Sequence, residues 1–243
     1  MSNVYGHPVL PLSAQPEGVH ITIQERIENA RFIAWRIYSE GFSYDATIGL
    51  LSAIYQESSC DPCCREVGGV GLGLYQRPIT STRQDFANMG YRDFETAWLD
   101  VVTNMYAQTD YIVYRLTQGS WGVPPRRHRE GDNWVIDGYF SLYPQYELTK
   151  TQLRTSTDRM SCAAALAVMS LHPYGVNDAY GYYGNEPSAD LLIQNVQSYQ
   201  RMVGSIGNWF TEQMLIDYVP PNKNPKFKMI YYLRPLWWNT IRR

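Results

Sequence analysis

The residues best suited to do chemistry lie between Ile48 and Gln76, where an acid follows an apolar run and precedes a glycine-rich stretch. Glu57 stands near the end of an expected helix, with Ala53 and Ile54 on or beside the same face. Apolar surroundings and a helix C-terminus both disfavour negative charge, so we expect the Glu57 carboxyl group to be partly protonated near neutral pH. Such a group can protonate a glycosidic oxygen as a general acid. An ordinary, partly exposed glutamate at a helix end is the alternative.

A cluster of glycines follows this acid at Gly68, Gly69, Gly71 and Gly73. This density predicts a hairpin or a bulged strand where a ligand can approach the backbone closely. The stretch lacks the GK[ST] ending of a phosphate-binding loop. Taken alone, it also fits a tight structural turn.

Together these motifs resemble the phage tail lysozyme domain of bacteriophage tail-tip and tail-knob proteins, and soluble lytic transglycosylases share part of the pattern. The residues that carry the resemblance are Gly41-Phe42-Ser43, Ile48-Gly49-Leu50-Leu51, Gln56-Glu57-Ser58-Ser59-Cys60-Asp61-Pro62 and Gly71-Leu72-Gly73-Leu74-Tyr75-Gln76. The sequence departs from the family at Arg77, where a tryptophan is usual, and at Leu171-His172-Pro173-Tyr174, where an E-R-P turn is usual.

The resemblance implies a mainly α, lysozyme-like α+β fold with a small glycine-rich β-hairpin at the cleft. It makes Glu57 the catalytic acid and Gln76 the residue that positions the sugar, with Ser58 and Tyr75 as further substrate-binding residues. The implied activity is cleavage of peptidoglycan between N-acetylmuramic acid and N-acetylglucosamine. The protein would ride on the virion, where it degrades the bacterial wall locally during infection. A structural virion protein with an inactive fold of this type is the alternative.

A glycosidase of this kind usually has a second carboxylate, and its position is left open by the sequence. The candidates are Asp61, Glu66, Asp85, Asp178 and Glu186. If none of them faces Glu57, the resemblance favours a lytic transglycosylase route, in which Glu57 acts first as acid and then as base. A weaker alternative is a cysteine peptidase that uses Cys63 or Cys64 with His172.

Capping residues and helical spacing predict the elements around these groups. Thr22 and Glu25 form a capping box that opens a helix, and Gly41 and Ser43 separate it from the helix that ends near Glu57. The expected core face of the first helix comprises Ile23, Ile27, Ala30, Ala34 and Ile37. Further helices are expected from Ser81 to Gly90, from Asp93 to about Leu116, over Asp158–Leu171 and from Pro187 to near Gly204.

Tyrosines cluster after the alanine-rich helix, at Tyr174, Tyr180, Tyr182 and Tyr183. Aromatic rings can stack on the apolar faces of sugars, so Tyr174 and Tyr182 are candidates for substrate contacts on the opposite lip of the cleft. Packing of these tyrosines over a helix end is equally compatible with the sequence.

The expected organisation is an N-terminal arm over residues 1–21, a catalytic domain over 22–204 with a long, irregular insertion at about 119–150, and an extension over 205–243. The insertion contains a basic cluster that could contact a wall polymer or another virion protein. From Pro220 to Arg243 basic and aromatic residues alternate without any acid. This pattern predicts docking onto another tail or virion protein. Contact with a single-stranded nucleic acid and packing back onto the chain's own domain are the alternatives.

Composition and charge also bear on other classes of protein, namely nucleic-acid-binding, membrane, secreted and metal-binding proteins. The formal net charge is −2, which makes a general nucleic-acid binder unlikely. No apolar run is long enough for a membrane span, and the N-terminus lacks the pattern of a secretory signal. No cofactor or metal is expected, because the four cysteines lack the partners of a zinc site. A disulfide to Cys162 and free buried thiols both remain open.

Overall fold

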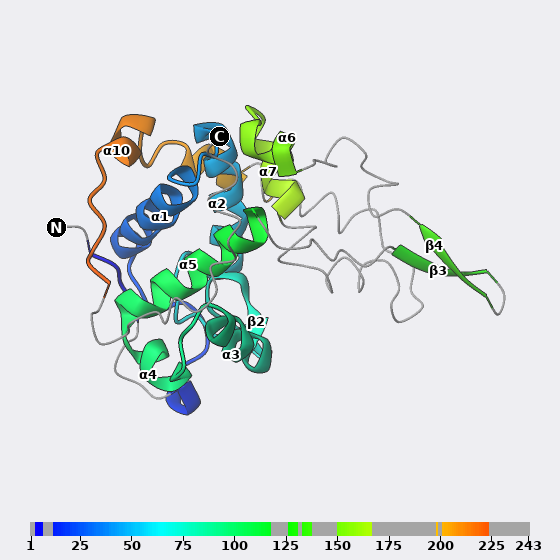
Figure 1. Ribbon diagram of the computed structural model, residues 1–243, viewed down its shortest axis with the longest axis horizontal. Coiled ribbons are helices and arrows are strands. Elements are labelled where there is room, and N and C mark those ends of the chain that lie inside the picture. The colour runs from blue at the N-terminus through cyan, green and yellow to red at the C-terminus, as the bar shows by residue number, and fades with distance from the viewer. Residues whose placement is uncertain are drawn as a thin grey trace, which may run out of the picture.

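The computed structural model describes residues 3–6, 12–117, 126–130, 133–137, 150–166, 198 and 201–223. This part of the chain is mainly helical, as the sequence predicts (Figure 1). Its helices are η1 (Leu12–Ala14), α1 (Ile23–Tyr38), α2 (Tyr44–Ser58), η2 (Gly73–Tyr75), α3 (Ile79–Asn88), α4 (Phe94–Leu99), α5 (Val101–Thr117), α6 (Lys150–Thr155), α7 (Arg159–Leu166) and α10 (Glu212–Ile216). None of these helices is long and apolar enough to cross a membrane.

In the described part of the chain, two short antiparallel pairs of strands accompany the helices. Strand β1 (Gly71–Leu72) pairs with β2 (Arg77–Pro78), and η2 forms the turn between them. This is the predicted small glycine-rich hairpin. Strand β3 (Arg126–Glu130) pairs with β4 (Asn133–Asp137) within the segment that was expected to be irregular, so that expectation was wrong for residues 126–130 and 133–137.

Helix α1 begins as the capping box predicts. The Thr22 side chain accepts from the backbone N–H of Glu25, and the Glu25 carboxylate accepts from the Thr22 N–H at 2.7 Å. Ala30, Ala34 and Ile37 are buried, but Ile23 is 57% exposed, so its assignment to the core face was wrong. The reason is its position at the first residue of the helix, since the buried residues of α1 begin only at Asn29.

Helix α2 contacts α1, α6, α7 and η2. Ser43 caps its N-terminus, accepting from the Ala46 N–H, and Gly41 with a φ of +86° separates it from α1. Every residue from Ala46 to Ile54 is buried. Gly49 allows α7 to approach closely, since a Cβ atom there would collide with the Arg159 carbonyl oxygen and lie 2.7 Å from the Cys162 Cβ. A helix buried on nearly every side is held rigidly, which suits it to position a functional group at its end.

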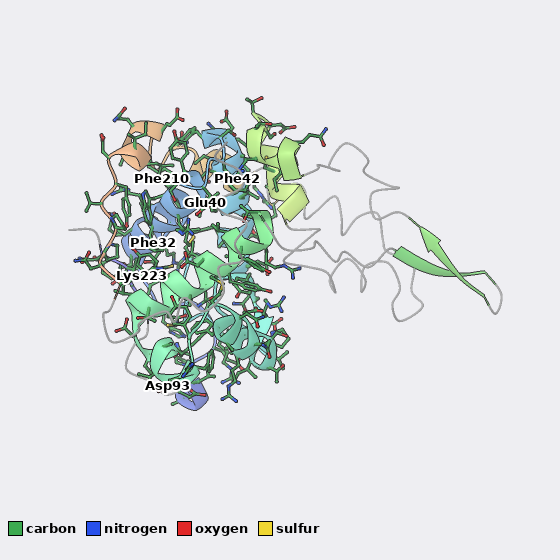
Figure 2. All side chains as sticks on the ribbon, viewed as in Figure 1. Phe32, Glu40, Phe42, Asp93, Phe210 and Lys223 are labelled. Atoms are coloured by element: carbon green, nitrogen blue, oxygen red, sulfur yellow. The ribbon has the colours of Figure 1, made fainter. Side chains whose placement is uncertain are left out.

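The buried hydrophobic residues of the described part of the chain form two clusters. The larger joins α1, α2, α5, α7 and the segment from Ile206 to Tyr218, and side chains fill the space between these helices (Figure 2). The smaller packs α3 and α4 against η1 and β1 around the fully buried Trp98. Parts of the expected N-terminal arm and C-terminal extension thus pack on the helical body, since Leu12 belongs to the smaller cluster and Phe210 to the larger.

Two helix boundaries differ from expectation. Helix α3 begins at Ile79, directly after Pro78, and not at Ser81. The long helix expected from Asp93 to about Leu116 is two helices, because Asp100 adopts an extended conformation between α4 and α5. The Asp100 carboxylate then accepts from the Thr103 N–H at 2.9 Å, which caps the first turn of α5. The expected helix over Asp158–Leu171 is described as far as Leu166, and most of the expected helix over residues 187–204 lies outside the described residues.

Candidate functional site

Glu57 lies in the last turn of α2 and is half-buried, which fits both a group on an apolar helix face and an ordinary, partly exposed glutamate at a helix end. The next residue joins this helix end to the glycine hairpin. The Ser58 hydroxyl is buried and can donate to the carbonyl oxygens of Leu74, at 3.0 Å, and Ile54, at 3.2 Å. Ser59 and Cys60 then take the left-handed conformation and turn the chain away. Glu57 is therefore fixed beside the hairpin by its own neighbour.

Gln76 holds the other side of this junction. Its backbone is left-handed, with a φ of +50°, and its side-chain amide donates to the Gly73 carbonyl oxygen at 2.7 Å. The same nitrogen lies 3.5 Å from the Cys64 carbonyl oxygen, and the Gly73 N–H donates to that oxygen at 2.7 Å. The amide nitrogen of Gln76 is thus engaged in shaping the hairpin, and any contact of Gln76 with a sugar stays a prediction.

Cys64 contacts Gln76 and feels the charge of Glu57. Burial and the negative charge of Asp61 raise the pKa of the Cys64 thiol to about 12, with Glu57 adding a smaller effect and a hydrogen bond from Gln76 opposing them. A thiol with this pKa is protonated at neutral pH, which argues against Cys64 as the nucleophile of a peptidase.

Buried polar side chains support the hairpin from below. Gln108 on α5 accepts from the Leu74 N–H at 2.6 Å and donates to the Pro62 carbonyl oxygen and to Asn104, each at 2.6 Å. Asn104 in turn donates to the Trp98 carbonyl oxygen. The sequence analysis missed this network, because Gln108 and Asn104 fall among ordinary helical positions. Their shared spacing of four residues on a buried face is the only signal that the sequence offers.

Two candidates for a second carboxylate are engaged in local structure. Asp61 is fully buried and accepts from the N–H groups of Cys63, at 2.9 Å, and His20, at 3.2 Å. Glu66 accepts from the Gly71 N–H at 2.8 Å and so closes the glycine turn. Both side chains hold the backbone that leads from α2 into the hairpin.

A third candidate, Asp85 on α3, is also engaged. Its carboxylate is 4% exposed and forms an ion pair with the Arg77 Nε at 2.8 Å. The Tyr75 hydroxyl lies 3.4 Å from the same oxygen, Oδ2, and Tyr111 also forms a hydrogen bond with Asp85. Burial raises the pKa of Asp85, while the charge of Arg77 and the two tyrosine hydrogen bonds oppose the rise. Tyr75, a predicted substrate-binding residue, is 3% exposed, and its ring stacks on Tyr111 at 5.6 Å.

Other predicted residues lie outside the described part of the chain, namely Tyr174, Tyr182, Asp178, Glu186 and His172. The opposite lip of the cleft therefore stays a prediction. Two surface hollows are lined by described residues, one of about 490 Å³ between the glycine hairpin and Arg83, and one of about 650 Å³ between α1 and Arg154. Glu57 and Gln76 line neither of them.

The cysteines and potential metal ligands complete the site. Cys60, Cys63, Cys64 and Cys162 are all buried free thiols, so the disulfide alternative to Cys162 was wrong. Among the described residues, no group of three His, Cys, Asp or Glu side chains is arranged to hold a metal ion. Comparisons with protein-family models, curated proteins and solved structures found no match to this chain. The family resemblance thus depends on the motif residues themselves.

Proposed function

We propose that this protein is a peptidoglycan-cleaving glycosidase with Glu57 as its general acid. The observation that carries the proposal is the junction of α2 with the glycine hairpin. Ser58 bonds to Leu74, and Gln76 bonds to Gly73 and contacts Cys64, so the helix end that carries Glu57 is joined to the hairpin that carries Gln76. These are the two residues to which the motif resemblance gives chemical roles.

The proposed chemistry follows from the acid's position. The Glu57 carboxyl group would donate its proton to the glycosidic oxygen as the bond to C1 of N-acetylmuramic acid breaks. The positive charge that develops at C1 must then be met by a second carboxylate, by water, or by a hydroxyl group of the same sugar. Which of these groups attacks C1 decides between hydrolysis and transglycosylation.

A specific observation favours the route that needs one acid. Asp61, Glu66 and Asp85 are each engaged with backbone N–H groups or with Arg77. With these carboxylates engaged, ionised Glu57 could accept the proton of the C6 hydroxyl group as its oxygen attacks C1, which yields a 1,6-anhydro product. A lytic transglycosylase is therefore the second candidate function.

The setting of the activity is also proposed from the resemblance. A bacteriophage particle would carry the enzyme to the wall and open it locally during infection. Pro220–Arg243 would dock onto another tail or virion protein. The competing proposal is a structural virion protein whose site is inactive, and the departures at Arg77 and His172 support it.

The decisive experiment compares the wild type with Glu57→Gln for release of soluble muropeptides from purified sacculi. Loss of the acid should lower the rate by about a hundredfold or more. Glu28→Gln is a matched control. Glu28 is another partly buried glutamate in a helix, where it pairs with Arg31 on α1, and its replacement should leave the rate unchanged.

The outcomes separate the alternatives. An inactive wild type supports the structural protein. Activity that survives Glu57→Gln removes Glu57 from the mechanism, and if alkylation of cysteines then abolishes it, the peptidase is supported. Mass spectrometry of the products distinguishes 1,6-anhydromuramic ends from reducing ends, and thereby the transglycosylase from the hydrolase.

A further inference from the structure

Arg77, the residue directly after Gln76, has a guanidinium group that the protein holds from two sides. Its Nε pairs with the buried Asp85 at 2.8 Å, and its Cζ atom lies over the rings of Tyr111, 5.6 Å from the centroid, and Tyr75, 6.0 Å from the centroid. An arginine anchored through Nε and an aromatic face keeps a fixed orientation. The side chain remains 28% exposed, whereas that of Asp85 is 4% exposed. Part of a rigid cation therefore reaches the surface.

A second guanidinium group belongs to the helix on which Arg77 packs. Arg115, in the last turn of α5, follows Tyr111 by four residues, so the two side chains share a helix face, and Arg77 lies over the ring of Tyr111. The charge of Arg115 also lowers the pKa of Asp85 and of Tyr111, in each case as a minor effect. Asp85 thus lies within reach of two guanidinium charges, and it forms its ion pair with Arg77. Within the described part of the chain, neither Arg77 nor Arg115 forms an ion pair with any other acid. The local balance of charge is positive, which is the condition for attracting an anion.

An exposed aromatic ring lies beside these cations. Tyr114 is 44% exposed, and its ring centroid is 6.5 Å from that of Tyr111, on which Arg77 packs. The surface thus combines an aromatic face that can contact sugar or peptide with a cation that can pair with an acid. Because Arg77 follows Gln76 in the chain, this surface adjoins the junction that holds Glu57.

We propose that Arg77 and Arg115 form a subsite for a free carboxylate of the peptide stems that peptidoglycan carries on its muramic acid residues. The inference depends on the proposed glycosidase function and adds a substrate preference to it. A guanidinium group pairs with a carboxylate through two parallel N–H···O bonds, and this geometry is available only on the side of Arg77 that Asp85 leaves unoccupied.

The test compares glycan strands that carry stem peptides with free carboxylates against matched strands whose carboxylates are amidated. The wild type should cleave the free-carboxylate strands with a kcat/KM about tenfold higher. Arg77→Gln and Arg115→Gln should each reduce this ratio toward one, while Arg77→Lys should retain part of it. Arg83→Gln is the matched control, since Arg83 is an exposed arginine on α3 that pairs with Glu95 and should keep the ratio of the wild type.

Each outcome decides the inference. A wild type that cleaves both strands equally, or a ratio that survives in both Arg77→Gln and Arg115→Gln, overturns the subsite and leaves the glycosidase standing. A wild type that cleaves neither strand overturns both. If Arg77→Gln fails to fold because Asp85 is left unpaired, Arg77→Gln with Asp85→Asn removes the buried charge, and Arg115→Gln tests the subsite without touching the ion pair.

Discussion

Gly73 sits where the glycine hairpin touches the residue beneath it. It has a φ of +75°, and a Cβ atom there would collide with the Gln108 side-chain oxygen that accepts from Leu74. Gly73→Ala should therefore lower the free energy of unfolding by about 2–4 kcal/mol, from backbone strain and from a broken buried hydrogen bond. Gly68→Ala is the control, because Gly68 has a φ of +70° with nothing within 4 Å of the added atom. It should show the backbone cost alone, about 1 kcal/mol, by urea denaturation.

Equal decreases in the free energy of unfolding of Gly73→Ala and Gly68→Ala would show that the contact between Gly73 and Gln108 does not affect stability. Muropeptide release in Gly73→Ala is a second measurement. If the hairpin positions Gln76 for a sugar, activity should fall more in Gly73→Ala than in Gly68→Ala under conditions where both are folded.

Asp85 gives a prediction with a definite sign in pH. Burial raises its pKa above the ordinary value of 3.8, so the folded protein holds this proton more tightly than the unfolded chain. The associated stability is complete below the unfolded pKa and is lost as the pH rises through the folded pKa. Asp85→Asn cannot titrate, so its free energy of unfolding should rise relative to that of the wild type as the pH increases from below 3.8 through the folded pKa of Asp85. Denaturant titrations across that range measure the difference.

The opposite trend would mean that the attraction of Arg77 outweighs burial and that the folded pKa of Asp85 is lowered. The comparison between the two proteins cancels the titration of all other carboxylates. It therefore reports on Asp85 and its partners alone.

The sequence could place some of these residues and not others, for a physical reason. Glu57, Ser58 and Gln76 lie within one short stretch, and their helix, turn and hairpin follow from local rules of capping and glycine conformation. The cluster of Arg77, Asp85 and Tyr111 depends on contacts between α3, α5 and β2, which only the tertiary fold establishes. Asp85, which the sequence left as a candidate for the second catalytic carboxylate, is therefore found to be the ion-pair partner of Arg77.

At the scale of elements, the approach of α7 to α2 depends on Gly49. Alanine is favoured over glycine in a helix by about 1 kcal/mol, but here the added methyl group would collide with the Arg159 carbonyl oxygen and crowd Cys162. We expect Gly49→Ala to destabilise the protein by about 1–3 kcal/mol despite its helix propensity. Gly204 also has helical backbone, with open space around the site of a Cβ atom, so Gly204→Ala should instead stabilise by up to about 1 kcal/mol.

Thermal and urea unfolding of the two alanine variants measure these opposite signs. Stabilisation by Gly49→Ala would show that α2 and α7 are farther apart than the structure has them.

The break between α4 and α5 was not predicted from the sequence, and the reason also lies in the pattern of whole elements. The apolar spacing continues through both helices, so the periodicity does not indicate the break. The break is visible only in the structure, where the Asp100 carboxylate accepts from the Thr103 N–H and caps α5.

At the scale of the whole molecule, the segment from residue 205 to 223 is joined to the helical body at several points. The Tyr44 hydroxyl donates to the Phe210 carbonyl oxygen at 2.6 Å, and the Trp35 and Tyr218 rings lie 5.7 Å apart. Lys223 pairs with Asp110 at 3.0 Å. The sequence predicted an extension here because basic and aromatic residues become frequent, but composition does not record which side chains enter the core.

The same segment should therefore unfold together with α1 and α2 in one transition. Leu215 is 1% exposed in the main core, whereas its neighbour Ile216 is 58% exposed. Leu215→Ala should lower the free energy of unfolding of the entire domain by about 2–4 kcal/mol, and Ile216→Ala should change it by about 0.5 kcal/mol or less. Circular dichroism and tryptophan fluorescence should report the same shifted midpoint for Leu215→Ala. Two separate transitions, with only the smaller one moved by Leu215→Ala, would instead make the segment an independently folding extension, because a residue can destabilise only the unit whose core it shares.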